Sequence, residues 1–291
     1  MESFLLPFIS GLGTGMVLFL IASGLSLIWG TSRVFNIAHA SLYMLGAYFM
    51  YAITHISSDG GELFFWIALI SGPIFVAILG GIIEITLLRK LYSAEQVYVI
   101  LFFIGLIYII DDLVKLIWGS LFLSVPMPTL FSGSMTIMGQ DYPSYFILIL
   151  GLSTLITGGL WFIIYRTRFG LSLRAAVMDR EMLGALGINT SRLFTLTFIL
   201  GCWLAGVAGC LIAPIRVVEP TMDGSVIVEA IAVVIIGGLG SIPGTLVASL
   251  IIGELGAFGI LAFPYLSTIL VFLVMAVVIT VRPWGLMGVQ E

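Results

Sequence analysis

Nine long apolar segments follow one another along this chain of 291 residues, and they constrain its fold more than any other feature. A membrane-spanning helix needs about 20 apolar residues to cross a hydrocarbon core about 30 Å thick. The segments do not alternate between apolar and polar residues, so the sequence predicts helices and not a β-barrel. The segments are Phe8–Trp29, Ile37–Ile53, Phe64–Leu88, Val97–Trp118, Tyr145–Tyr165, Leu193–Ala213, Ser225–Gly237, Thr245–Ala262 and Leu266–Val281.

The composition supports an all-α fold inside a membrane. Hydrophobic residues make up 60% of the chain and charged residues 9%, whereas about 25% of the residues of a soluble domain are charged. So few charges exclude a soluble enzyme, a disordered protein and a nucleic-acid-binding protein, which would carry a basic stripe. We therefore predict that residues 1–291 form a single polytopic transmembrane helical bundle with about eight or nine spans, embedded in membrane lipid.

The basic residues predict how the chain is oriented, because arginine and lysine favour the cytoplasmic side of a membrane. With the N-terminus outside, nine of the 11 basic residues fall in cytoplasmic connections, whereas the reverse orientation leaves two there. We therefore expect the N-terminus outside and the C-terminus inside. The cytoplasmic set is Arg33, Arg89, Lys90, Arg166, Arg168, Arg174, Arg180, Arg192 and Arg282, and the outer set is Lys115 and Arg216.

Two connections are longer than the others. The outer one, 119–144, is rich in Ser, Gly, Pro and Met, and it predicts an ordered cap or hairpin on the outer surface, with an unstructured linker as the alternative. The cytoplasmic one, 166–192, predicts a helix over Leu173–Leu186 that ends at Gly187. A cap of the next helix is expected at Asn189, Thr190 or Ser191.

The predicted cytoplasmic helix carries more information than charge alone. A plain loop that obeys the charge rule remains an alternative interpretation of 166–192. Such a loop would not need a run of helix-forming residues, whereas a helix bearing both signs of charge suits docking to a soluble partner. The charged residues of this helix are Arg174, Asp179, Arg180 and Glu181.

Polar residues at membrane depth are candidates for functional positions, because they are costly to bury there. Asn36 and His39 are three residues apart, so we expect them on one helix face at the cytoplasmic start of a short span. They form either a hydrogen-bonding pair between helices or part of a transport path or its gate. With few potential ligands nearby, they predict no metal site.

A short span interrupted by glycine and proline is a further pointer to a transport path. Glu229 lies in the short segment Ser225–Gly237, which is followed by Gly238, Gly240 and Pro243. The segment either spans the membrane or re-enters it, and the charge rule favours spanning. We expect Glu229 either to line the path or to be protonated and hydrogen-bonded.

Other polar and small residues have structural interpretations. Glu84 is expected to pair with the basic end of its span at Arg89 and Lys90. Asp111, Asp112 and Lys115 have the spacing of helix ion pairs. Glu254, in the middle of a span, has the same two interpretations as Glu229. Small residues four apart, as in Gly11–Gly15 and Gly201–Gly209, predict close helix packing.

No catalytic motif appears in the sequence. It lacks H-E-x-x-H, G-x-S-x-G and C-x-x-C patterns, and it lacks the glycine-rich loop with lysine that binds nucleotide phosphates. We therefore expect no enzyme activity and no cofactor in this chain. If ATP drives transport, another subunit binds it.

Five stretches in order resemble the permeases of branched-chain amino acid ABC transporters, LivH type. The resemblance covers nearly the whole chain, although Ala40 replaces the glycine that follows the histidine in the family's N-x-A-H-G element. The stretches are Gly24–Gly30 with Phe35–His39, Phe169–Ile188, Leu204–Gly209 (L-A-G-x-A-G), Gly237–Gly244 (G-G-x-G-S-x-x-G) and Arg282–Leu286 (R-P-x-G-L).

The resemblance implies an importer in the inner (plasma) membrane of a prokaryote. It implies a second related permease or a homodimer, two ATP-binding cassette ATPase subunits inside and a solute-binding protein outside. The substrates would be branched-chain or other small amino acids, with urea, amides or aromatic carboxylates as alternatives in the same family. A self-sufficient ion-coupled transporter is the rival class.

The resemblance also assigns roles to residues of this chain. The cytoplasmic loop would contact the ATPase, and the polar and glycine positions would line or gate the path. The coupling residues are Arg174, Ala175, Asp179, Arg180, Gly184 and Gly187, and the path residues are Asn36, His39, Glu229, Gly238 and Gly240.

Overall fold

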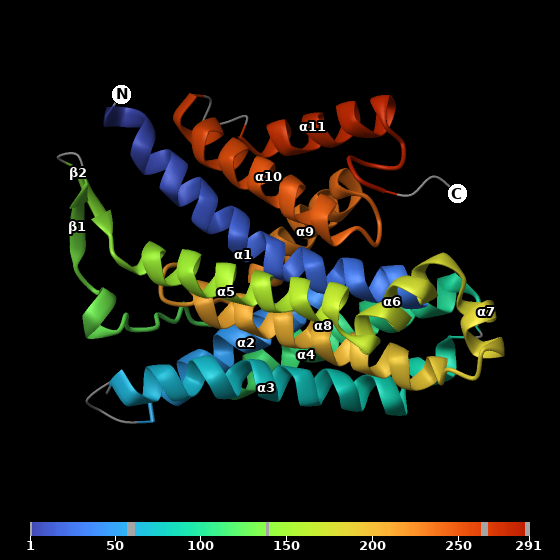
Figure 1. Cartoon of the computed structure of the whole chain (residues 1–291). Coiled ribbons are helices and arrows are strands. Elements are labelled where there is room, and N and C mark those ends of the chain that lie inside the picture. Colours follow the sequence, from blue (N-terminus) through green and yellow to red (C-terminus); the bar gives the residue numbers. More distant parts are fainter. Residues whose placement is uncertain (1, 57–61, 93, 138–139, 263–266, 289–291) are drawn as a thin grey trace.

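The computed structural model describes residues 2–56, 62–92, 94–137, 140–262 and 267–288 (Figure 1). Each of the nine predicted apolar segments is helical over most of its described length, although Leu266 lies outside the described residues. The helices are α1 (Glu2–Ser32), α2 (His39–Thr54), α3 (Glu62–Thr86), α4 (Gln96–Trp118), α5 (Tyr145–Arg166), α6 (Arg168–Met178), α7 (Arg180–Ala185), α8 (Thr190–Ile212), α9 (Met222–Gly237), α10 (Ile242–Ala262) and α11 (Ser267–Val281), with short 3₁₀ turns η1 (Leu88–Leu91) and η2 (Thr129–Phe131).

The helices fall into two length classes. Six helices of the described chain are long and apolar enough to cross a membrane: α1, α3, α4, α5, α8 and α10. By contrast, α2 and α9 have 16 residues each and α11 has 15. At a rise of about 1.5 Å per residue, a 16-residue helix is about 24 Å long, which is shorter than the hydrocarbon core.

The predicted outer and cytoplasmic connections lie at opposite ends of the bundle. The start of α1 and the hairpin of β1 (Ser134–Ile137) and β2 (Gln140–Pro143) lie at one end, and α6 and α7 lie at the other (Figure 1). The C-terminal segment joins the α6–α7 end, because the N–H of Leu286 donates to the carbonyl of Ile236 over 2.7 Å. We call the α6–α7 end cytoplasmic, following the distribution of basic residues.

The helices α1–α3 and α8–α10 share one plan. In both groups, a long helix is followed by a non-helical segment, a short helix and a long helix. The contacts between helices correspond as well. The helix α1 packs against α10, and its counterpart α8 packs against α3. Likewise, α9 packs against α1, and α2 packs against α8. Because α1 runs toward the cytoplasm and α8 away from it, the two groups form an inverted repeat, which is a frequent plan of transporters.

The short helix α2 begins inside the bundle, which corrects the predicted start at the cytoplasmic surface. A Cβ placed on Gly24 would lie only 2.8 Å from Nε2 of His39. Gly24 precedes the end of α1 at Ser32 by eight residues, which correspond to about 12 Å of helix. The chain therefore turns at the end of α1 and re-enters the bundle through 33–38 before α2 starts.

The short helix α9 also begins inside the bundle. Asp223, in its first turn, accepts a hydrogen bond from Ser41, which is in the first turn of α2. The opposite end of α9 leads into the turn at Gly240, whose Cα lies 3.1 Å from the position of a Cβ on Gly30, near the cytoplasmic end of α1. The chain thus crosses the membrane here in two parts, the non-helical segment 213–221 and then α9.

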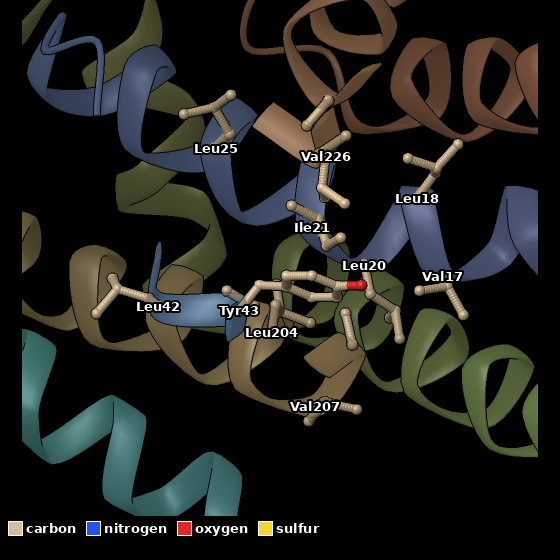
Figure 2. Packing of buried hydrophobic residues seen from close by; sticks show 14 of the residues in the cluster. Val17, Leu18, Leu20, Ile21, Leu25, Leu42, Tyr43, Leu204, Val207 and Val226 are labelled. Carbon is tan, nitrogen blue, oxygen red and sulfur yellow. The ribbon is translucent and has the colours of Figure 1, made fainter. Parts of the chain in front are cut away.

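Glycines allow the central helices to touch through their backbones, as the small-residue spacing predicted. A Cβ on Gly209 would clash with the carbonyl oxygen of Tyr43, and one on Gly206 would lie 2.9 Å from Cα of Pro73. Between these contacts, side chains of α1, α2, α8 and α9 fill the core (Figure 2). Figure 2 shows Ile21, Tyr43, Leu204 and Val226 meeting there.

The cytoplasmic connection contains two helices where the sequence predicted one over Leu173–Leu186. The first begins earlier, at Arg168, and the break falls at Asp179, whose backbone is extended (φ −154°, ψ 102°). Oδ1 of Asp179 accepts a hydrogen bond from the N–H of Met182 over 2.9 Å. Aspartate competes with the helical backbone in this way, so it starts α7 instead of continuing α6.

The predicted ends of this connection are confirmed. Gly187 has φ +81°, and the N–H of Ile188 donates back to the carbonyl of Leu183, which ends α7. Oδ1 of Asn189 accepts from the N–H of Arg192 over 3.0 Å and so caps α8.

The outer connection is an ordered cap, as predicted. The strands β1 and β2 pair antiparallel, with Met135 opposite Tyr142. Leu123 and Val218 exchange two backbone hydrogen bonds, which fix the connection to the segment between α8 and α9. The carboxylate of Glu62 accepts hydrogen bonds from Thr129 and from the N–H of Leu130, so the start of α3 also contacts the cap.

The close approach of α2 to α8 gives a test of the packing. Gly209→Ala places a methyl group against the backbone oxygen of Tyr43, and we expect the free energy of unfolding to fall by about 1–3 kcal/mol. Gly158→Ala in α5 is the control, because a Cβ at Gly158 would meet nothing within 4 Å. Thermal unfolding of the purified protein in detergent measures both, and equal midpoints for the two variants would contradict the close packing.

Candidate translocation and coupling site

Two helix N-termini meet inside the bundle, and this junction organises the candidate site. Oγ of Ser41 donates to Oδ2 of Asp223 over 2.6 Å, and both side chains are buried. The N-terminus of a helix carries a partial positive charge, so the first turn of α9 favours a carboxylate at Asp223. The sequence analysis missed this pair, because the two residues are 182 positions apart.

Asn36 and His39 lie beside the junction, but they do not share a helix face as predicted. Asn36 belongs to the non-helical segment before α2, and the helix begins at His39. Their backbones are joined by a hydrogen bond from the N–H of His39 to the carbonyl of Asn36. The helix starts late because the chain must first run back into the bundle.

The side chains of Asn36 and His39 are completely buried and unpaired among the described residues. The amide of Asn36 has no hydrogen-bond partner. The imidazole ring of His39 lies near the backbone of Ile21, but neither ring nitrogen forms a hydrogen bond. The predicted hydrogen-bonding pair between helices is therefore not formed. Unsatisfied buried polar groups are costly, so their presence agrees with a functional role, which remains a prediction.

Glu229 lies on α9, six residues beyond Asp223 and thus about 9 Å closer to the cytoplasm. Its side chain is half-buried, and its charge interacts with that of Arg216 in the segment between α8 and α9. This interaction gives Glu229 a counter-charge at membrane depth. A role in lining the path stays a prediction for this residue.

Gly238 and Gly240 form the turn between α9 and α10. Their φ values are +101° and +80°, which favour glycine. The turn is enclosed by other backbones, because a Cβ on Gly238 would lie 2.5 Å from the nitrogen of Gly288. Both predicted path residues therefore have a structural role at the cytoplasmic end.

The helix α6 contacts this turn through one side chain. Cγ2 of Val177 lies 3.2 Å from the position of a Cβ on Gly30, and its Cγ1 lies 3.6 Å from that of Gly240. Val177 therefore packs between the end of α1 and the α9–α10 turn. No motif singled it out, because a valine on a helix carries no chemical signal.

The coupling residues make local contacts that shape the connection. Nη1 of Arg174 donates to the carbonyl of Ile164 over 3.1 Å, and its guanidinium lies 5.0 Å from the ring centroid of Tyr165. Arg174 thus anchors α6 to the end of α5. The carbonyl of Ala175 accepts from the N–H of Asp179, which ends α6.

The remaining coupling residues define α7. Arg180 begins this helix, and its side chain lies outside the described part of the structure. The carbonyl of Gly184 accepts from the N–H of Gly187, where the helix ends. The elbow formed by α6 and α7 also exposes four large apolar side chains, which are Leu171, Met178, Met182 and Leu186.

A buried polar network holds the cytoplasmic ends of α3 and α8 together. Glu84 is completely buried, and its carboxylate accepts from Thr195 over 2.7 Å, from Tyr92 over 3.2 Å and from Arg89 over 3.4 Å. Arg89 also donates to Thr195 over 2.6 Å. The predicted pairing with Arg89 is thus confirmed. Burial and the Glu84 carboxylate raise the pKa of Tyr92, so it stays a hydroxyl donor.

The predicted pairing of Asp111, Asp112 and Lys115 is only partly formed. Lys115 pairs with Asp112 over 3.6 Å. Oδ1 of Asp111 is buried without a hydrogen-bond partner among the described residues, and so are both carboxylate oxygens of Glu254, which lie against Gly11. The hydrogen bonds expected for Glu254 are therefore not present.

A cavity of about 170 Å³ lies at the cytoplasmic end, between the segment 32–35 and the segment 91–100. Its lining includes Arg33, Phe35, Tyr92 and Gln96. Because Phe35 precedes Asn36, the cavity places open space on the cytoplasmic side of the α2 start.

An inverted repeat with interrupted helices and buried polar groups at their junction defines a polytopic membrane transport protein. The family described as branched-chain amino acid transport system / permease component matches residues 8–279. The chain belongs to this family.

Three relatives are similar over almost their whole lengths. The high-affinity branched-chain amino acid transport system permease protein LivH of Escherichia coli (strain K12) is 28% identical, covering 99% of this chain and 96% of the relative. BraD of Pseudomonas aeruginosa is 30% identical, covering 99% and 97%, and LivH of Salmonella typhimurium is 30% identical, covering 99% and 96%. No solved structure matches the chain.

The Glu84 network gives a stability prediction. Arg89→Ala leaves a buried carboxylate without its cation, and we expect a loss of about 3–5 kcal/mol. Lys90→Ala is the control, because Lys90 is adjacent and exposed and should change stability by at most about 0.5 kcal/mol. Unfolding midpoints in detergent measure both, and an Arg89→Ala protein as stable as the control would show that Glu84 needs no counter-charge.

Proposed function

We propose that this chain is the membrane subunit of an ATP-driven importer of branched-chain or other small amino acids. The observation that carries the proposal is the full-length similarity to LivH and BraD, whose names assign them to branched-chain amino acid transport. The inverted repeat and the junction of α2 with α9 support a transport path. ATP is bound by partner subunits in this proposal, because the sequence has no loop for nucleotide phosphates.

The α6–α7 elbow is the proposed contact with an ATPase subunit. It lies at the cytoplasmic end of the bundle (Figure 1), and Met178, Met182 and Leu186 expose apolar side chains there. Flexible methionine side chains adapt to a partner groove. Arg174 and Asp179 shape this elbow from within, so their role in coupling is to position it.

A movement of the elbow has a direct route into the bundle. Val177 packs against Gly30 of α1 and against Gly240 in the turn that begins α10. The other end of α9 is bonded to α2 by Asp223 and Ser41. Closure of the ATPase subunits would therefore shift α6, then α9, and then the junction where the path is closed. The free energy comes from the different affinities of the ATPase for nucleotide in the two states.

The other partners follow from the same class of importer. A solute-binding protein would dock on the outer cap formed by 119–144, which is ordered and fixed to the segment between α8 and α9. A second copy of this chain, or a related permease, would complete the path. The inner membrane of a prokaryote holds the assembly.

Reconstitution tests the proposal. The complete importer, with its ATPase and solute-binding protein, is expected to accumulate radiolabelled leucine in liposomes only when ATP is supplied. The control uses this chain alone with a proton gradient, where no uptake is expected. Uptake by the chain alone would instead favour an ion-coupled transporter, and selective uptake of urea, amides or aromatic carboxylates would reassign the substrate.

The anchor at Arg174 gives a coupling prediction. Arg174→Ala removes the bond to Ile164 and the contact with Tyr165, so α6 loses its position on α5. We expect leucine uptake to fall by about tenfold, which corresponds to about 1.4 kcal/mol of coupling free energy, while ATP hydrolysis continues. Arg168→Ala, at the exposed start of α6, is the matched control. An unchanged ratio of leucine imported to ATP hydrolysed would refute the anchoring role.

A further inference from the structure

We propose that Ser41, Tyr48, Asp111 and Asp223 form a site for the ammonium group of the transported amino acid, in the part of the bundle between the α2–α9 junction and the outer surface. We call these residues the α2–α4–α9 cluster. The inference rests on the proposed function and adds to it the chemical group that the permease itself recognises.

The geometry of three helices brings the cluster together. Tyr48 of α2 contacts Trp118 of α4, with ring centroids 5.2 Å apart. Both helices run toward the outer surface, and seven residues make about two helical turns. Ser41 therefore lies on the same face of α2 as Tyr48, two turns earlier. In the same way, Asp111 lies on the same face of α4 as Trp118. Ser41 donates to Asp223 of α9. Asp111 is close enough to Asp223 for the two charges to act on each other.

The two carboxylates have no cation between them. Lys115 pairs with Asp112, and its charge also acts on Asp111 from further away. Among the described residues, no arginine or lysine forms an ion pair within 4.0 Å with Asp111 or Asp223. The charges of Asp111 and Asp223 interact with each other. Two neighbouring acids at membrane depth are costly unless a proton or a cation joins them.

Tyr48 provides a second and independent indication of a ligand. Its side chain is completely buried, and its hydroxyl has no hydrogen-bond partner among the described residues. The hydroxyl interacts with the charges of Glu219 and Asp111, so it lies near these acids. A buried tyrosine hydroxyl normally finds a partner. The oxygens of Tyr48 and of the two aspartates are therefore acceptors available to a donor that enters from outside.

An ammonium group fits these acceptors better than a metal ion does. Within the described part of the chain, no three carboxylate, histidine or cysteine side chains converge as metal ligands would. A primary ammonium carries one positive charge and three N–H donors, which match two carboxylates and a hydroxyl. An uncharged amide or urea could donate hydrogen bonds to the two acids but would leave their charges unneutralised, so the cluster favours amino acids over these alternatives.

Uptake by three variants tests the proposal. The complete importer in liposomes, supplied with ATP and leucine-loaded binding protein, carries Asp111→Asn, Asp223→Asn or the control Asp112→Asn. Asp112 is adjacent to Asp111, and its side chain is 80% exposed. We expect leucine uptake to fall about tenfold or more for Asp111→Asn and Asp223→Asn and to stay unchanged for the control, since hydrogen bonds to charged groups are strong.

Additional readouts separate recognition from structure. The concentration of loaded binding protein that gives half-maximal uptake should stay unchanged, because docking occurs outside the cluster. Asp111→Asn should also keep the unfolding midpoint, because Oδ1 of Asp111 makes no hydrogen bond that would be lost. Loss of uptake with a fall in this midpoint would assign Asp111 a structural role and overturn the proposal.

The remaining outcomes are also decisive. Wild-type uptake rates for Asp111→Asn and Asp223→Asn would overturn the ammonium site and leave the proposed function intact. Leucine uptake by the wild type that requires sodium or potassium would replace the ammonium by an inorganic cation. If the wild-type importer takes up no amino acid, the proposed function and this inference are both refuted. The wild type is measured first, so this outcome is distinguished from an effect of the variants.

Discussion

The backbone of a protein in lipid must satisfy its own hydrogen-bonding groups, and this constraint shapes the whole structure. Most of the described chain meets it with helices, but 33–38 and 213–221 run through the bundle as non-helical segments. They are tolerated because protein encloses them, as the burial of Asn36 and Val218 shows. The interruptions create two helix starts inside the membrane, and every candidate path residue except Gly238 and Gly240 lies near one of them or on the helix that follows.

The same constraint explains where polar side chains gather. A helix start leaves N–H groups and a partial positive charge at membrane depth, and acids such as Asp223 are stabilised there. The network around Glu84 satisfies every part of its buried carboxylate and holds α3 to α8. By contrast, Asn36, His39, Tyr48 and Asp111 keep buried polar atoms unpaired within the described chain. The network around Glu84 is therefore structural, whereas the unpaired groups are the ones to which we assign a role in the proposed transport path.

The sequence was sufficient for the features that depend on local patterns. Apolar length predicted the nine helical segments, and glycine at position 187 and asparagine at position 189 predicted a helix end and a cap. It was insufficient where the result depends on contacts between distant segments. The break at Asp179, the late start of α2 and the bond between Ser41 and Asp223 depend on such packing. The sequence places Arg174 in the helical connection between α5 and α8, but no pattern shows that its side chain turns back to Ile164.

In the proposed mechanism, the junction of α2 and α9 opens and closes without exposing backbone to lipid. The bond from Ser41 to Asp223 suits this requirement, since it joins two side chains and can exchange for a bond to a solute without disturbing either helix. The glycine turn at Gly238 and Gly240 supplies a joint at the opposite end of α9, and Val177 connects that joint to the cytoplasmic elbow. The short helix α9 can therefore tilt as a unit. A replaceable hydrogen bond holds one of its ends, and a glycine turn holds the other. This arrangement allows a push on the elbow to reach the solute in the middle of the membrane.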